Sequence, residues 1–133
     1  MSGDKVTSDT NVLIYMSKGL IDEQKLLQLN FNVFYVSVIT FMELYGCNFK
    51  NPNEKERIDR FFNYIEVVHT NTSIADKVIE YRVSASKKIK LPDAIILATA
   101  SYLKATLLTD DWDDFQNIDN DVAISNLDYL KVG

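Results

Sequence analysis

Short apolar runs alternate along the chain with segments whose apolar residues fall at helical spacing. Residues 33–37 (VFYVS) are rich in β-branched and aromatic side chains, and residues 105–109 (ATLLT) form a second run of this type, so both predict strands. Residues 72–88 carry an apolar stripe typical of an amphipathic helix, formed by Ile74, Val78, Tyr81 and Ala85. Strands that alternate with helices favour an α/β fold with a parallel sheet.

The same reasoning predicts the whole order of elements, which is β-α-α-β-α-α-β-α-α-β-α-β. The expected strands are Lys5–Ser8, Val33–Ser37, Glu66–His69, Ala105–Thr109 and Val122–Ser125. The expected helices are Asn11–Ser17, Asp22–Leu29, Thr40–Tyr45, a segment opening at Asn53, Thr72–Lys88, Pro92–Lys104 and Asp111–Gln116. We therefore expect a central, mostly parallel sheet of about five strands flanked by helices, with a site beyond the carboxyl ends of the strands.

Composition is that of an ordinary globular protein. The chain has 133 residues, 47% hydrophobic and 25% charged, which predicts one domain over residues 1–133. No apolar run approaches the roughly 20 residues of a membrane helix, and the first residues (MSGDKVTSD) lack the apolar core of a signal peptide. The single cysteine, Cys47, cannot form an internal disulfide, so we expect a cytoplasmic protein with no membrane partner.

The net charge bears on whether the chain binds nucleic acid or metal ions. The net charge is −5, which argues against a broad basic surface that grips nucleic acid. Acids gathered in one pocket would account for most of this charge and leave a nearly neutral shell around them. Divalent cations bound there would neutralise the pocket itself. The acidity is therefore compatible with a metal site.

Four acidic residues stand just after a predicted strand or at the start of a predicted helix, namely Asp9, Glu43, Asp93 and Asp111. The topology of a parallel sheet brings such positions to one edge. Carboxylates gathered at one edge repel one another unless a cation separates them. Oxygen-rich sites suit Mg²⁺ or Mn²⁺ rather than zinc, and these ions support in-line attack of water on a phosphodiester.

Each of the four acids also has a purely structural explanation. Thr40 and Glu43 have the T-x-x-E spacing of a capping box. Asp93 and Asp111 suit helix N-termini, and Asp9 suits an Asx-turn. For one acid alone the structural explanation is the commoner one, whereas four at equivalent strand ends favour a shared site.

The remaining polar and aromatic residues offer weaker candidates. The only histidine, His69, leaves no material for a catalytic triad or a histidine metal site, and Cys47 has no histidine near it in the sequence. One basic cluster precedes Asp93 and either forms a solvated helix end or touches a phosphate backbone; it comprises Lys87, Lys88 and Lys90. Three aromatic residues near the predicted site either stack on bases or pack in the core, and these are Tyr15, Phe41 and Tyr45.

Four segments resemble the motifs of PIN domains, in the family's order. Residues 8–14 (SDTNVLI) resemble the opening D-T-N-x-L-I motif, and residues 36–44 (VSVITFMEL) resemble S-x-x-T-x-x-E-L. Residues 91–100 (LPDAIILATA) resemble D-A-x-I-x-A-T-A, and residues 107–115 resemble L-x-T-x-[ND]-x-x-D-F. The motifs span nearly the whole chain. Each is weak alone, and together they are specific.

The size of the chain resembles that of VapC-type toxins within this family. The resemblance implies a three-layer α/β/α fold and a Mg²⁺- or Mn²⁺-dependent endoribonuclease, in which one or two ions activate the attacking water. It also implies an RNA substrate, a cognate antitoxin that inhibits the enzyme, and a homodimer. The implied metal-binding and catalytic acids are Asp9, Glu43, Asp93 and Asp111, supported by Asn11, Ser37, Thr109 and Asp114.

Other interpretations stay open on the sequence alone. Asp110 competes with Asp111 for the last acidic position, because the fourth motif carries extra acids. A PIN-fold module that only binds a partner protein is the alternative function. A phosphotransferase would need a second aspartate at position 11, where this chain has Asn11. A receiver domain would need a lysine near the end of a late strand, and ATLLT has none.

Overall fold

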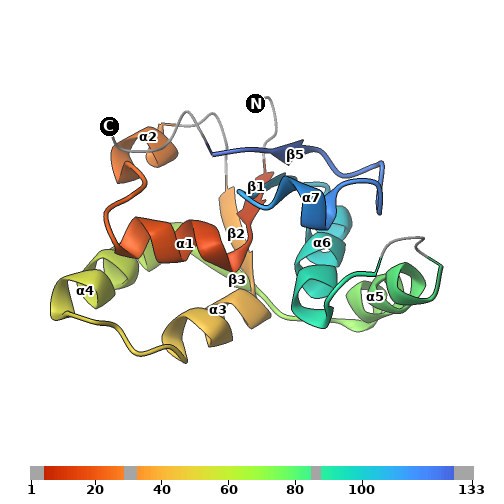
Figure 1. The fold of residues 1–133 in the computed structure, drawn as a ribbon, viewed down its shortest axis with the longest axis horizontal. Coiled ribbons are helices and arrows are strands. Elements are labelled where there is room, and N and C mark those ends of the chain that lie inside the picture. The colour runs from red at the N-terminus through yellow and green to blue at the C-terminus, as the bar shows by residue number, and fades with distance from the viewer. Residues whose placement is uncertain (1–4, 29–32, 85–87, 128–133) are drawn as a thin grey trace.

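A five-stranded parallel sheet with strand order β3-β2-β1-β4-β5 lies at the centre of the structure (Figure 1). The structure is a computed structural model, and it describes residues 5–28, 33–84 and 88–127. The strands are β1 (Lys5–Ser8), β2 (Val33–Ser37), β3 (Ile65–Val68), β4 (Thr106–Leu108) and β5 (Ile124–Ser125). The predicted parallel sheet is confirmed.

The strand order places a topological switch point between β1 and β4. The chain builds the sheet outward from β1 in one direction through β2 and β3, and in the other direction through β4 and β5. Ser8, the last residue of β1, pairs with Leu108, the last residue of β4. The next residues of both strands therefore leave the sheet side by side, which is where ligands bind in open α/β sheets.

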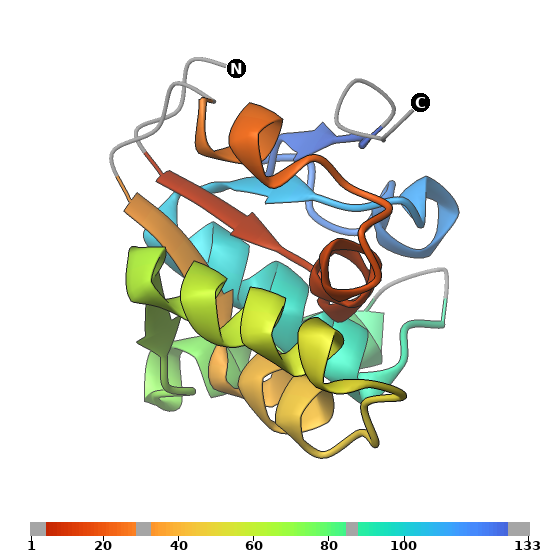
Figure 2. The same cartoon turned by 90° about the vertical axis from the view of Figure 1, so that its left-hand side faces the viewer.

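Helices cover both faces of the sheet, which confirms the three-layer α/β/α fold (Figures 1 and 2). They are α1 (Thr10–Ser17), α2 (Glu23–Leu27), α3 (Val38–Tyr45), α4 (Pro52–Phe61), α5 (Thr72–Ser84), α6 (Leu91–Leu103), α7 (Trp112–Phe115) and the 3₁₀ turn η1 (Phe62–Tyr64). Leu108 belongs to the core cluster under α1, α2 and α4, whereas its neighbour Leu107 belongs to the cluster under α5 and α6. Successive side chains of a strand point to opposite faces, so each face has its own core.

Several predicted boundaries differ from the structure. The helix predicted from Thr40 begins at Val38, because Ser37 caps it directly after β2. The helix predicted to reach Lys88 is described from Thr72 to Ser84, residues 85–87 lie outside the described part, and Lys88 is not helical. Pro92 takes the second position of α6 rather than the first. The helix predicted from Asn53 begins one residue earlier, and the predicted second helix ends at residue 27, with residue 29 outside the described part.

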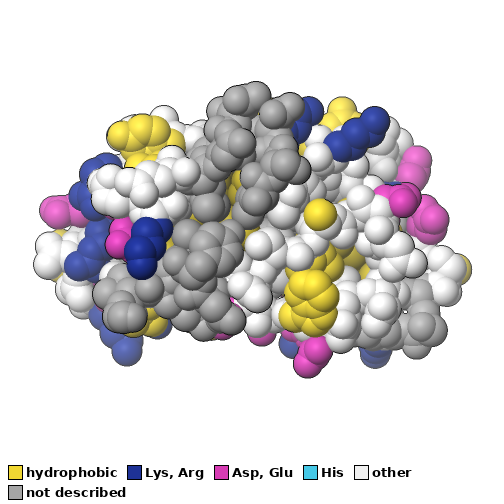
Figure 3. All heavy atoms as spheres, turned by 90° about the horizontal axis from the view of Figure 1, so that it is seen from above, with side chains coloured by type: hydrophobic (Ala, Val, Ile, Leu, Met, Phe, Trp, Pro, Cys, Tyr) yellow, Lys and Arg dark blue, Asp and Glu magenta, His cyan; other side chains and the backbone are white. Residues whose placement is uncertain are grey.

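The described part of the surface carries both positive and negative side chains. On the face seen in Figure 3, Lys and Arg side chains lie beside Asp and Glu side chains at both ends of the molecule. The longest described helices, α5 and α6, have 13 residues each. Among the described helices, none has the length and apolar character needed to span a membrane.

Candidate active site

Asp9 and Asp111 meet at the switch point between β1 and β4. Asp9 follows β1 and caps α1, since its Oδ1 accepts the backbone N–H of Val12 at 3.2 Å. The Thr109 hydroxyl, one residue after β4, donates to Asp9 Oδ2 at 2.5 Å and accepts the N–H of Asp111 at 2.9 Å. Asp9 is therefore an N-cap rather than the Asx-turn considered above, and one threonine joins the two acids.

The side chain of Asp111 faces α1. Its Oδ2 accepts a hydrogen bond from Asn11 Nδ2 at 3.0 Å, across 100 residues of sequence. Asp111 stands at the N-cap position of α7, but its side chain makes no capping hydrogen bond within the described residues. A role at a helix N-terminus therefore does not explain its carboxylate. Asn11 and Thr109, both predicted to support the site, lie against the acids.

Glu43 reaches the same region from α3. Ser37 caps α3 by accepting the N–H of Ile39 at 3.2 Å, so Thr40 lies inside the helix and is fully buried. The capping box suggested for Thr40 and Glu43 is therefore wrong, because β2 runs directly into the helix and moves the cap to Ser37. Glu43 Oε1 instead accepts the Thr10 hydroxyl at 2.6 Å.

Thr10 is a contact that the sequence reasoning missed. Its hydroxyl also lies 3.2 Å from the Thr40 hydroxyl, so it links the first turn of α1 to α3. Its place between Asp9 and Asn11 in the D-T-N motif was the available signal. The three consecutive residues of this motif thus touch Thr109, Glu43 and Asp111, respectively.

Asp93 lies in the first turn of α6 and completes the group. Burial raises the pKa of its carboxyl, and the negative charges of Asp114, Asp111 and Glu43 raise this pKa further. The ammonium of Lys90, at the N-cap of α6, lowers the pKa of Asp93. Among these carboxylates, Asp114, which was predicted as a supporting acid, raises the pKa of Asp93 the most.

Asp9 is the most deeply buried of the four acids, with 4% of its surface exposed. Burial raises the pKa of Asp9 to about 6, although the hydrogen bonds from Thr109 and Val12 oppose the change. The charges of Asp111 and Asp93 raise the pKa of Asp9 further. Like charges held this close favour protonation of one partner or binding of a cation.

The donor set fits a hard divalent cation. All candidate ligands are carboxylate oxygens, which suit Mg²⁺ or Mn²⁺. Within the described residues, no three His, Cys, Asp or Glu side chains are close enough to form a preassembled metal cage. Mg²⁺ does not require one, because it keeps several waters and is bound through one or two carboxylates. Hydrogen bonds partly offset the raised pKa of Asp9, whereas none from the described residues offsets that of Asp93.

The other sequence candidates lie around the site or away from it. Asp110 is exposed, while Asp111 makes the contact with Asn11 and raises the pKa of both Asp9 and Asp93. His69 is exposed, and the Cys47 thiol donates to the Leu44 carbonyl at 2.9 Å. Lys88 and Lys90 are exposed before α6, and Lys87 falls outside the described residues.

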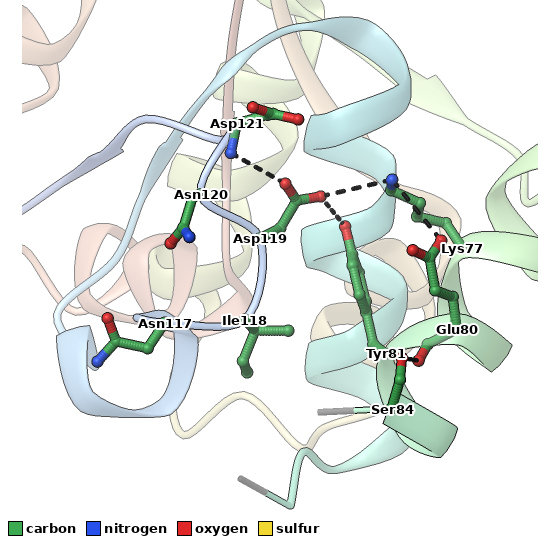
Figure 4. A pocket seen from close by; sticks show the side chains of 9 residues that line it. All are labelled: Lys77, Glu80, Tyr81, Ser84, Asn117, Ile118, Asp119, Asn120 and Asp121. Carbon is green, nitrogen blue, oxygen red and sulfur yellow. Dashed lines mark hydrogen bonds and ion pairs between the residues drawn. The ribbon is translucent and has the colours of Figure 1, made fainter. Parts of the chain in front are cut away.

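A polar pocket of about 560 Å³ lies between α5 and the turn 117–121, and none of the four acids lines it (Figure 4). The hydroxyl of Tyr81 donates to Asp119, which also accepts the N–H of Asp121 at 3.0 Å. Lys77 lies 4.0 Å from the same carboxylate. Tyr81 and Lys77 thus pair with Asp119 and fasten the turn to α5.

Comparisons with known proteins identify the family and the fold. A model of the PIN domain family matches residues 6–121. A toxin–antitoxin complex from Klebsiella pneumoniae contains a chain with 29% identity and a TM-score of 0.71, and the match covers 89% of this chain and 95% of that one. FitAcB from Neisseria gonorrhoeae gives 26% identity and a TM-score of 0.73, over 94% and 99% of the two chains.

VapBC2 from Rickettsia felis, bound to a DNA fragment from its promoter, shares the fold with a TM-score of 0.77 at 23% identity. That match covers 93% of this chain and 99% of the other. No curated protein matches the sequence at a significant level. The four acids and their threonine and asparagine partners all fall within the matched residues 6–121.

Proposed function

This chain belongs to the PIN domain family, and from that premise we propose that it is a Mg²⁺- or Mn²⁺-dependent endoribonuclease, the toxin of a VapBC-type pair. One observation carries the proposal. Asp9, Glu43, Asp93 and Asp111 come from four elements at the carboxyl edge of the sheet, where burial first, and neighbouring carboxylates in addition, raise the pKa of Asp9 and Asp93. Such a group favours a cation over its own full ionisation.

A divalent cation bound to these acids would supply water activation and neutralisation of phosphate charge. The chain's own residues fix the geometry. Thr109 and the N–H of Val12 hold both oxygens of Asp9, so this buried carboxylate keeps one orientation. Asn11 holds Asp111 and Thr10 holds Glu43. Asp9, Glu43 and Asp111 are thus positioned by neutral partners, which leaves little rearrangement to make when substrate arrives.

Substrate access is open on the side of Glu43 and Lys90. Glu43 is exposed and Asp93 is half-buried, whereas Asp9 forms the floor of the site. Lys90 is exposed immediately before α6 and lowers the pKa of Asp93, so its ammonium lies close to that carboxylate. We assign Lys90 to contact with the phosphate backbone of the RNA, because phosphate contacts from lysine position a strand without reading its sequence.

The proposed partner is an antitoxin with a basic segment. The Klebsiella pneumoniae toxin–antitoxin complex and FitAcB, both above 25% identity, support a toxin in this family. Arg or Lys side chains of an antitoxin would pair with the four acids and exclude the cation. We further propose a homodimer. A stable monomer whose activity no co-expressed neighbour inhibits would contradict this part of the proposal.

The deciding experiment is cleavage of single-stranded RNA by the purified chain in chelator, Mg²⁺ and Mn²⁺. The Asp93→Asn variant should lose metal-dependent cleavage and retain its circular dichroism spectrum. Asp76→Asn is the matched control, because Asp76 is an exposed aspartate on α5 and the charge change is the same. Equal rates for Asp93→Asn and wild type would remove Asp93 from the site. A wild-type chain that cleaves no RNA with either metal would favour a module that only binds a partner.

A further inference from the structure

Two pockets adjoin along the segment between α3 and α4. The outer pocket, of about 580 Å³, is lined by Tyr45, Pro52, Lys55 and residues 47–51. The inner pocket, of about 230 Å³, is lined by parts of α1 and α4, by Leu44 and by residues 47–50. Residues 47–50 line both, and the two pockets together are called here the loop groove. Figure 2 shows α1, α3 and α4 on the same side of the sheet.

The loop groove begins one helical turn from the acids. Thr10 and Glu43 are hydrogen-bonded across α1 and α3. Ile14 lies one turn after Thr10 on α1, and Cys47 lies one turn after Glu43, beyond a Gly46 that keeps helical backbone angles. Ile14 and Cys47 both line the inner pocket. A helix rises 1.5 Å per residue, so this pocket opens roughly 6 Å along the two helices from the Glu43 contact.

An aromatic wall runs along the groove. Phe49 lines both pockets and is half-buried, and its ring centroid lies 6.3 Å from that of Tyr45, with the planes at 72°. The Tyr45 hydroxyl donates to Asp59 at 2.7 Å, and its ring also packs 5.5 Å from that of Phe62. Tyr45 is therefore held both at its hydroxyl and at its ring, and Phe49 packs against it. Rings fixed in this way are platforms for nucleobases, which stack on them with little sequence preference.

The charge of the groove is positive although that of the chain is −5. Three exposed lysines line it, and these are Lys18, Lys50 and Lys55. The ammonium of Lys55 is also paired with the exposed carboxylate of Asp59 at 2.8 Å. The one acid among its lining residues, Glu54, is buried and bonded to Asn51, which donates to Glu54 Oε2 at 3.2 Å and caps α4. The groove thus offers lysine ammonium groups to a ligand, beside a ring face.

We propose that the loop groove binds a nucleotide of the RNA strand adjacent to the scissile phosphate, with Phe49 against the base and Lys50 and Lys55 against the phosphates. This inference rests on the proposed function. It gives the path of the RNA strand beyond the four acids. RNA fits better than an acidic peptide because the groove combines aromatic rings with lysines, and its inner pocket begins one helical turn from the Glu43 contact. Aromatic rings next to a basic groove are the usual means of holding single strands.

Cys47 gives a direct readout. It is the chain's only cysteine, it is exposed, and it lines both pockets. A strand in the groove should slow the reaction of its thiol with a chromogenic disulfide. The measurement is this rate with excess single-stranded RNA, in chelator and, at early times, in Mg²⁺. Failure of RNA to slow the reaction in either condition overturns the inference.

Variants test the named contacts. In Lys50→Gln/Lys55→Gln and in Phe49→Leu, half-protection of Cys47 should need about tenfold more RNA. Phe49→Trp should restore protection, because it keeps a stacking face. Lys5→Gln/Lys25→Gln is the matched control, since it removes two exposed lysines elsewhere and should leave protection unchanged. Equal protection in all variants overturns the inference.

The outcomes separate this inference from the proposed function. RNA cleavage without protection of Cys47 retains the nuclease and removes the groove from the RNA path. Protection of Cys47 by RNA without cleavage retains the groove and removes the nuclease. Protection by a co-purified protein, with none by RNA, overturns the inference and assigns the groove to a protein partner.

Discussion

Two nearly buried aspartates in this molecule have opposite surroundings. Asp119 has 6% of its side chain exposed and is matched by the Tyr81 hydroxyl, the Asp121 N–H and the Lys77 ammonium. Asp9 has 4% exposed, and its charged neighbours are other carboxylates. The first arrangement stabilises a turn. At Asp9, burial and in addition the neighbouring carboxylates raise the pKa to about 6, and a cation would neutralise the surplus negative charge.

The comparison teaches how to distinguish a structural acid from a functional one in this fold. Both side chains are largely removed from solvent, so burial alone does not identify a site. The sign of the neighbouring charge distinguishes the two acids. A carboxylate paired with a cation stabilises the fold, whereas a carboxylate beside other carboxylates destabilises it. The predictions below exchange or remove these neighbours, from the largest expected effect to the smallest.

Activity should depend on Asp9 and not on Asp119. Asp9→Asn should lower metal-dependent RNA cleavage by roughly a thousandfold, because a bound cation supplies several kcal/mol of transition-state stabilisation. Asp119→Asn should leave the cleavage rate of the folded protein unchanged. Initial rates on one RNA, with folding checked by circular dichroism, provide the test. A similar loss in both variants would mean that rigidity, rather than charge, sets the rate.

The pH dependence of stability should carry the signature of Asp9. Its pKa is about 6 in the folded chain against an ordinary value of 3.8, so the folded state holds this proton more tightly. Stability is therefore greatest below pH 3.8 for this group and falls as pH rises through 6, by about 3 kcal/mol in total. The measurement is urea unfolding of wild type and Asp9→Asn at pH 4 and pH 7, in chelator.

Only the difference between the two proteins counts, since other groups titrate equally in both. Asp9→Asn should be close to wild type at pH 4 and more stable at pH 7. A variant that is less stable than wild type at pH 7 would show that the cap on Val12 outweighs the repulsion.

Loss of the Tyr81 hydroxyl should affect stability and leave activity intact. Tyr81→Phe removes one hydrogen bond to the buried Asp119 carboxylate. A hydrogen bond to a charged group contributes about 2 kcal/mol, so the melting temperature should fall measurably. Burial and Asp119 both raise the pKa of Tyr81, so the effect should be the same from pH 6 to pH 8. A lowered cleavage rate in the folded variant would contradict the separation of the two regions.

The smallest effect is expected for Asp93→Asn in chelator. The amide removes a charge that its acidic neighbours repel, so the variant should melt slightly above wild type. Wild type should then gain more than the variant from millimolar Mg²⁺ or Mn²⁺, since binding to the folded state alone stabilises it. A helix N-terminal role predicts the reverse, a loss of up to about 1 kcal/mol with or without metal.

The sequence by itself determined the local elements and the family. Strands such as Val33–Ser37 and helices such as α6 follow from the spacing of apolar residues. The positions that face the core are apolar, and they recur with the period of the element. The polar strand Lys5–Ser8 was predicted correctly, although it carries buried Thr7 and Ser8 at the sheet centre. The candidate acids also came from short motifs.

The tertiary structure decided how those acids are held. Pairing of β1 with β4 places Asp9 on Thr109 and Asn11 on Asp111, each across 100 residues. The direct passage from β2 into α3 turned Glu43 from a capping residue into a partner of Thr10. No periodicity encodes such contacts, because strand order and helix placement depend on the packing of the whole chain. The charge environment that separates Asp9 from Asp119 exists only once that packing is complete.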